Sequence, residues 1–321
     1  MPKPSVVVRP LIVSATLAAA AAGPAAGQTQ SDFGGVRTAE PPAETRAFDP
    51  DAWSLVWADE FDVDGPPNPE HWGYELGLIR NRELQLYTDR PENARVEDGV
   101  LVIEAIREEV SNPGYDPDAP EEQWQASWKT VPHTSAGLNT RGKHDMTYGR
   151  IAARAKLPEG RGMWPAIWML ASDIDVGGGR AADGSPGVPW PRCGEIDIME
   201  YVGHEPGVAH TAVHTGVRNH MVGNHPTGRI SPGDLHDTFR TYAVEWDADK
   251  IEFFVDDTLV QTYVNDSDTH ADPEGVWPFD KPHYLIMNIA VGGAWGGQQG
   301  VDESIFPQRM EVDWVRVWER K

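Results

Sequence analysis

The sequence predicts an all-β protein built as a sandwich of two antiparallel sheets, most simply a β-jelly roll. From Trp53 onward, short runs of aromatic and β-branched residues alternate with Gly, Pro, Asn and Asp, the pattern of strands separated by turns. The dipeptide Asp98-Gly99 stands between two alternating runs, which is a strong hairpin signal. Helical periodicity is scarce over the same span. Many short strands with turn punctuation are typical of this class.

The expected strands follow one another along the chain. The first clear pair is a hairpin at Val96 to Ile103, turning at Asp98-Gly99. The others have the same composition and are Arg150 to Leu157, Trp164 to Leu170, Thr241 to Trp246, Ile251 to Val255, Leu259 to Val264, Tyr284 to Val291 and Val312 to Trp318. About 270 residues follow the N-terminal region, which suits one large β domain at 50–321.

The N-terminal 49 residues have a different character. Residues 1–27 carry Lys3 and Arg9, an apolar run from Leu11 to Ala22 and the small residues Ala25-Ala26-Gly27. This is the pattern of a cleaved signal peptide, and its apolar core is short for a membrane span. Residues 28–49 predict a linker or a disordered N-terminus. We therefore expect a secreted protein, either extracellular or periplasmic.

Charge and cysteine content restrict the partners. Fifty acidic residues against 27 basic ones give a net charge of -23, which disfavours nucleic acid and anionic membranes. A neutral substrate fits best, and we expect a monomer with no membrane partner after signal cleavage. The single cysteine, Cys193, cannot form an internal disulfide and is expected to be a small buried residue.

The most informative segment carries three carboxylates, Glu195, Asp197 and Glu200. A strand that alternates acid and Ile places Glu195 and Asp197 on one face. Glu200 lies an odd number of residues from Glu195, so a regular strand would turn it into the apolar side, where an unpaired carboxylate is costly. A β-bulge at or near Met199 would return Glu200 to the acidic face, and bulges are frequent beside active sites.

Three carboxyls on one face suit glycoside hydrolysis, in which one carboxyl is a general acid and another a nucleophile. Repulsion between them is expected to separate their pKa values. Convergence from one curved strand predicts a separation of roughly 5 to 5.5 Å, the spacing of a retaining enzyme. Taken alone, the motif leaves open a solvated strand face or a cation site.

Further motifs give the chain a resemblance to glycoside hydrolase family 16, and within it to bacterial laminarinases, endo-1,3-β-glucanases. The resemblance covers nearly the whole domain and implies a concanavalin-like jelly roll with a concave substrate cleft. Besides the acidic strand, it rests on Trp57 to Asp62, Arg80 to Gln85, Glu92 to Ala94, Thr147 to Arg150, Gly162 to Leu170, Val213 to Thr215, Tyr242 to Trp246, Asn288 to Gly293 and Val312 to Val317.

The resemblance implies specific roles. Glu195 would be the nucleophile, Glu200 the general acid and later base, and Asp197 the assisting carboxylate between them. The extra residue Met199 gives the bulged form of the family strand, which favours laminarinases over lichenases and leaves agarases and carrageenases open. No catalytic cofactor is implied.

Substrate contacts are also implied. Trp164 and Trp168 match cleft tryptophans on which sugar rings would stack, although a core role is the alternative for both. Trp295, in a Gly-rich loop, is a candidate for the cleft rim. His214 would hydrogen-bond Glu200 or a substrate hydroxyl, or else is a structural histidine. Three polar residues match a loop at the non-reducing side: Arg80, Asn81 and Glu83.

Two groups of residues in the sequence raise the question of a metal site. Six histidines lie between residues 204 and 236, but their irregular spacing gives no zinc pattern. The resemblance implies a structural calcium ion on the convex face, held by Glu60 and Asp313, because carboxylate oxygens suit this cation.

The sequence is also compatible with competing hypotheses. A member of the same family acting on mixed-linkage β-1,3-1,4-glucan or on a galactan would share the catalytic strand. A β-glucan recognition protein would share the fold but lack catalytic carboxylates, whereas all three are present here. Transglycosylation would proceed through the same intermediate as hydrolysis.

Overall fold

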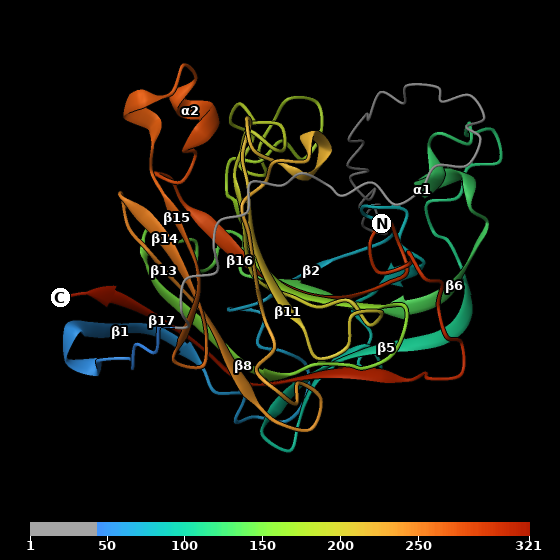
Figure 1. Cartoon of the computed structure of the whole chain (residues 1–321). Coiled ribbons are helices and arrows are strands. Elements are labelled where there is room, and N and C mark those ends of the chain that lie inside the picture. Colours follow the sequence, from blue (N-terminus) through green and yellow to red (C-terminus); the bar gives the residue numbers. More distant parts are fainter. Residues whose placement is uncertain (1–43) are drawn as a thin grey trace, which may run out of the picture.

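The computed structural model describes residues 44–321 as two antiparallel sheets packed face to face (Figure 1). The larger sheet has the order β15-β14-β13-β8-β17-β5-β6-β3, with β1 paired to β17 and β4 paired to β5. The smaller sheet has the order β12-β11-β10-β9-β16-β7-β2. The pair β3 and β6 is parallel. The predicted two-sheet all-β sandwich is confirmed, whereas the predicted signal peptide at 1–27 lies outside the described residues.

The strands have the following bounds. The larger sheet contains β1 (Trp53–Asp59), β3 (Gln85–Tyr87), β4 (Ala94–Glu97), β5 (Val100–Ser111), β6 (Thr130–Ser135), β8 (Gly149–Lys156), β13 (Arg240–Trp246), β14 (Lys250–Val255), β15 (Thr258–Val264) and β17 (Gln308–Arg320). The smaller sheet contains β2 (Gly73–Glu75), β7 (Gly137–Asn139), β9 (Met163–Ala171), β10 (Glu195–Glu200), β11 (Ala209–His214), β12 (Thr227–Ile230) and β16 (His283–Val291).

Each strand expected from the sequence is present, and most ends differ by a few residues, whereas β5 continues from the expected end at Ile103 to Ser111. The turn between β4 and β5 uses Asp98 and Gly99 at φ of 55° and 78°, the left-handed conformation that a type I′ hairpin requires.

Helices are short in the described part of the chain. They are α1 (Trp124–Ser127), α2 (Pro273–Val276) and three 3-10 turns, η1 (Pro50–Ala52), η2 (His220–Val222) and η3 (Ser267–Thr269). Among the described residues, no helix has the length and apolar character needed to cross a membrane.

The main core lies between the two sheets and contains side chains from both. The smaller sheet contributes alternate residues, such as Ile167 and Met169 of β9 and Leu285 and Met287 of β16. Their neighbours Trp168 and Ile286 belong to a second apolar cluster, because successive side chains of a strand point to opposite faces. The inner face of the smaller sheet therefore packs on the core, and its outer face carries the candidate site.

The packed region begins before residue 50. Arg46 donates to Glu245 and Glu252 at 2.8 and 3.0 Å, and Phe48 packs against Trp318. Residues 44–49, which the sequence grouped with the linker, therefore lie against the larger sheet.

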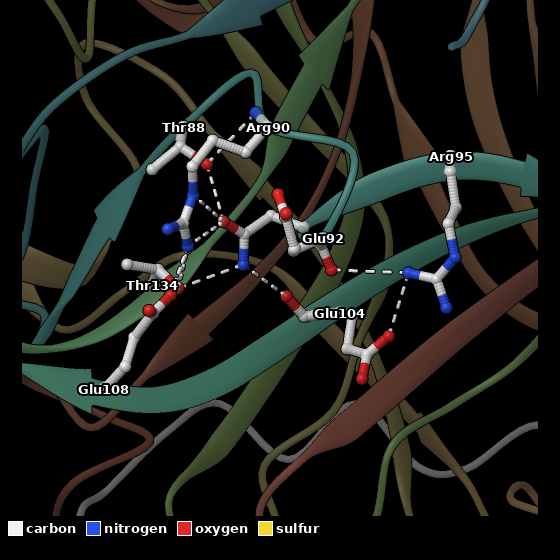
Figure 2. A network of polar contacts seen from close by, with 8 residues as sticks. Thr88, Arg90, Glu92, Arg95, Glu104, Glu108 and Thr134 are labelled. Atoms are coloured by element: carbon white, nitrogen blue, oxygen red, sulfur yellow. Dashed lines mark hydrogen bonds and ion pairs between the residues drawn. The ribbon is translucent and has the colours of Figure 1, made fainter. Parts of the chain in front are cut away.

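Within the motif Glu92-Asn93-Ala94, the Asn93 side chain holds the turn before β4 in place, and Figure 2 labels its partners Thr88, Arg90, Glu104 and Thr134. The Asn93 amide accepts from Thr88 at 2.6 Å and from Arg90 at 3.0 Å, and donates to the Glu104 carbonyl at 3.0 Å and to Thr134 at 3.1 Å. Asn93 is fully buried, so these bonds replace the water that it loses on folding. One side chain thereby connects the turn to β5 and β6.

Candidate active site

The acidic strand is β10, near the middle of the smaller sheet between β9 and β11. Its register shifts between Asp197 and Met199 against β9, and between Asp197 and Glu200 against β11. The adjacent residues Ile198 and Met199 both lie in the inter-sheet core. The predicted β-bulge is therefore confirmed, and it places Glu200 on the same outer face as Glu195 and Asp197.

His214 lies on β11 directly opposite Glu195. Its Nε2 is 3.7 Å from Glu195 Oε1 and 3.4 Å from Asp197 Oδ2, and the ring of His225 stacks on it at 4.8 Å. Of the alternatives given for His214, a bond to Glu200 is not the one that the structure shows, since the carboxylates near its Nε2 are those of Glu195 and Asp197. Because residues opposite each other in neighbouring strands lie closest, the pairing with Glu195 directs His214 to the other end of the carboxyl cluster.

Burial dominates the electrostatics of the three carboxyls. It raises the pKa of Glu195 and of Glu200, each to about 8, with the nearby Asp197 adding to both shifts. Burial also raises the pKa of Asp197 well above its usual value. The repulsion expected to separate the two glutamates does not distinguish them here, because both are desolvated to a similar degree. Proton loss from this cluster is therefore a property of the coupled group.

Trp190 is a site residue that the sequence analysis missed. It lies in the loop before β10, and its indole Nε1 donates to Glu195 Oε2 at 2.9 Å. Its ring lies 5.1 Å from His220 and 6.0 Å from His214. The available signal was a Trp-Pro pair just ahead of the acidic strand, but one tryptophan among 13 does not indicate by itself which carboxylate it reaches.

Trp164 contacts the other glutamate. This residue of β9 donates from its indole Nε1 to Glu200 Oε1 at 3.0 Å. Trp295 packs edge-on against Trp164 at 5.6 Å, and His210 of β11 packs edge-on against Trp295 at 5.1 Å. The structure thus brings the predicted residues Trp164 and Trp295 together beside Glu200.

Trp168 lies on the same face as Trp164, as its parity predicts, but it is not an open platform. Its side chain is buried, its indole donates to Asn288 Oδ1 at 2.7 Å, and the Arg80 guanidinium covers its ring at 4.8 Å. The predicted exposure of Trp168 is corrected accordingly. A flat ring whose face already carries a guanidinium cannot also stack on a sugar there.

The polar loop forms a hydrogen-bonded network beside Trp168, in which Glu83 is buried, Arg80 is partly buried and Asn81 is exposed. Arg80 pairs with Glu75, and the buried Glu83 accepts from Gln85 at 2.7 Å and from Asn81 at 3.2 Å. Burial raises the pKa of Glu83 to about 7. Arg80, Asn81 and Glu83 are therefore occupied with one another and with their neighbours.

Among residues 44–321, one group of side chains has the spacing of a metal site, namely Glu195, Asp197 and His214, with ligand atoms within 4.8 Å of one another. These are the same groups that form the carboxyl cluster.

The predicted calcium ligands are arranged differently. Both oxygens of Glu60 accept from Arg316, at 2.7 and 2.8 Å, and Asp313 pairs with Arg154. Carboxylates neutralised by guanidinium groups are poor donors for a dication, since each arginine would repel it. As they lie, the side chains of Glu60 and Asp313 form two ion pairs and are not arranged around a calcium ion, so calcium binding by these residues stays a prediction.

The arrangement can perform acid–base and nucleophilic chemistry on one bond. Two glutamates lie on one face, each with its own indole donor, and an aspartate lies between them. This is the equipment for protonating a leaving oxygen while a carboxylate attacks the adjacent carbon.

Comparison with known proteins agrees with this chemistry. Residues 88–316 match the family model described as glycosyl hydrolases family 16. A beta-glucanase of Rhodothermus marinus is 48% identical over 272 residues, which cover 83% of this chain and 85% of the relative.

Solved structures show the same likeness. The laminarinase from Rhodothermus marinus superimposes with a TM-score of 0.70 at 45% identity, covering 84% of this chain and 98% of the other. A non-specific endo-beta-1,3(4)-glucanase, co-crystallized with 1,3-beta-D-cellotriosyl-glucose, gives 0.72 at 39% identity and covers 88% of this chain and all of the other.

Proposed function

The chain belongs to glycosyl hydrolases family 16, and from this premise we propose that it is an endo-1,3-β-glucanase of the laminarinase type that cleaves by double displacement. The observation that carries the proposal is the bulged strand β10, which places Glu195, Asp197 and Glu200 on one face beside His214. The 48% identical beta-glucanase and the superimposed laminarinase support the substrate class.

In the first step, a Glu195 oxygen attacks the anomeric carbon while the bond from that carbon to the leaving oxygen breaks. Glu200 gives its proton to the leaving oxygen, so the released sugar departs as a neutral alcohol. In the second step, Glu200 takes a proton from water, and the water oxygen displaces Glu195 from the same carbon. Two inversions give overall retention.

Asp197 and His214 act on the nucleophile side. Asp197 lies beside Glu195 in the carboxyl cluster. Each negative charge disfavours ionisation of the other carboxyl, so the protonation states of the two groups are linked. His214 Nε2, 3.7 Å from Glu195 and 3.4 Å from Asp197, supplies a polar contact from β11. A neutral sugar polymer also agrees with the net charge of -23.

The substrate test measures reducing-end release from laminarin, lichenan, agarose and carrageenan in parallel, with Glu200→Gln as the blank. We expect preference for laminarin and loss of activity in the variant. Activity only on a galactan would overturn the substrate, and binding without turnover on any polymer would favour a recognition protein. Retention is tested separately by following the anomeric configuration of the first product by NMR.

A second substrate is favoured by one comparison. The structural relative at 39% identity is described as a non-specific endo-beta-1,3(4)-glucanase, so mixed-linkage glucan is the alternative for this chain. Comparable rates on laminarin and lichenan would establish the broader specificity.

We further propose that residues 1–27 direct secretion and are removed, and that the mature enzyme acts as a monomer. The cationic and apolar composition of this segment supports export. Expression of the full chain with N-terminal sequencing of the exported product tests the cleavage, and light scattering tests the oligomeric state. A retained N-terminus or a stable dimer would overturn the respective statement.

A further inference from the structure

We propose that the indoles of Trp190 and Trp164 are a pair of positioning donors, one for each catalytic glutamate, that keep the nucleophile and the acid in their separate roles. The inference rests on the proposed double displacement and assigns a second role to Trp164 besides sugar contact. Trp190 has no role in the sequence prediction.

The two contacts are alike in geometry but come from different parts of the chain. Trp190 Nε1 donates to Glu195 Oε2 at 2.9 Å, and Trp164 Nε1 donates to Glu200 Oε1 at 3.0 Å. Trp164 lies on β9, whereas Trp190 lies in the loop before β10. Both indoles are partly buried, and each glutamate has one oxygen left for its reaction.

An indole N–H suits this task because of its chemistry. It donates one hydrogen bond, accepts none and does not titrate at neutral pH. It therefore holds a carboxylate in place without offering a route by which the two glutamates could exchange a proton. A donor also favours the ionised carboxylate, so it opposes the burial that raises both pKa values.

Aromatic packing fixes each donor. The Trp190 ring rests against His220 and His214, and the Trp164 ring rests against Trp295. Rings held on a second side cannot swing freely, which keeps the N–H pointed at its carboxylate.

Several other titratable groups lie near the two glutamates, and they also contribute to the pH dependence of activity. Asp197 adjoins both glutamates on β10, and His214 faces them from β11. The remaining groups are more distant: Cys193 just before β10, His210 opposite Glu200, and His220 and His225 around His214. A phenylalanine replacement leaves all of these groups unchanged.

The test compares pH profiles of kcat/KM on laminarin for the parent, Trp190→Phe and Trp164→Phe. Both limbs belong to the coupled carboxyl cluster; in the proposed roles, the acidic limb depends mainly on ionisation of the nucleophile and the basic limb on loss of the proton from the acid. Trp190→Phe is expected to move the acidic limb up by about one pH unit, because a hydrogen bond to a charged group is lost. Trp164→Phe is expected to move the basic limb up by a similar amount and leave the acidic limb in place.

The control is Trp128→Phe, a partly buried indole in a separate apolar cluster, for which neither limb should move. Thermal melting of all variants shows that each is folded. The positioning role would be overturned if both variants are folded and neither limb of their pH profiles moves. It would also be overturned if the same limb moves in both variants. A parent without activity on laminarin would instead overturn the proposed function, so the two failures are distinguishable.

Discussion

At the scale of single residues, the site depends on carboxyls that are expensive to bury. Glu195, Asp197 and Glu200 all have raised pKa values because the fold removes water from them. The compensating contacts are few: one indole for each glutamate and His214 near two of the three. The enzyme thus retains groups that cost stability, as functional sites commonly do.

Replacing the nucleophile tests its role directly. Glu195→Gln is nearly isosteric, and we expect it to lower kcat on laminarin by roughly 10³-fold or more while the melting transition remains cooperative. Asp197→Asn should cost less, because that carboxyl forms no bond to the sugar. Reducing-end assays and circular dichroism give the two readouts. Activity of Glu195→Gln near that of the parent would contradict the assignment.

The raised pKa values also predict how stability depends on pH. A glutamate whose pKa rises from 4.5 unfolded to about 8 folded favours the folded state while it is protonated. That contribution is complete below about pH 4.5 and is lost as the pH rises toward 8. Glu195→Gln and Glu200→Gln should therefore melt about 2 to 6 °C above the parent at pH 8 and equal to it near pH 4. Scanning calorimetry across this range measures the difference, and a constant difference at all pH values would contradict the linkage.

At the scale of elements, the sequence predicted the features that local periodicity controls, namely the strands and the bulge. Alternation in β9 and β16 follows the two-residue period of a strand, and the odd spacing from Glu195 to Glu200 required the bulge. What local pattern could not predict was contact between distant segments. Trp168 has the expected parity, yet Arg80 from another loop covers it. Trp190 is close to Glu195 in the sequence, but it lies in a loop without a regular period, so the direction of its indole toward Glu195 could not be predicted.

The turn before β4 gives a prediction at this scale. Asn93→Ala removes one buried amide and leaves the partners around it, including the Glu104 carbonyl, without their hydrogen bonds. We expect the free energy of unfolding to fall by about 2 to 3 kcal/mol. Asn265→Ala is the matched control, because its amide makes only two bonds near the surface, donating to the Ala248 carbonyl and accepting from the Ser267 N–H, and it should cost about 1 kcal/mol or less. Urea titration measures both, and equal losses would contradict the anchoring role of Asn93.

At the scale of the whole molecule, ion pairs join segments far apart in the sequence. Glu60, just after β1, pairs with Arg316 of β17, and Asp313 of β17 pairs with Arg154 of β8. The resemblance to the family suggested calcium at Glu60 and Asp313. The sequence alone does not show whether the cationic partner of a carboxylate is a metal ion or an arginine. In the structure both carboxylates pair with arginines of the same sheet, and these ion pairs connect the two terminal strand regions to it.

This arrangement predicts the effect of chelation. Because the guanidinium groups already neutralise both carboxylates, EDTA should leave the melting temperature unchanged within about 1 °C, and added Ca²⁺ should not raise it. A ligand that bound only the folded state would raise the melting temperature by mass action.

Replacing Arg316 with Met should lower the free energy of unfolding by about 1 kcal/mol, the upper end for an ion pair at a partly exposed surface. The same variant also tests calcium binding, because Glu60 then loses its arginine partner Arg316. If calcium stabilises Arg316→Met but not the parent, the ion pair occupies the place of a metal site. A fall of several degrees when EDTA is added to the parent would instead show that the ion pairs yield to calcium.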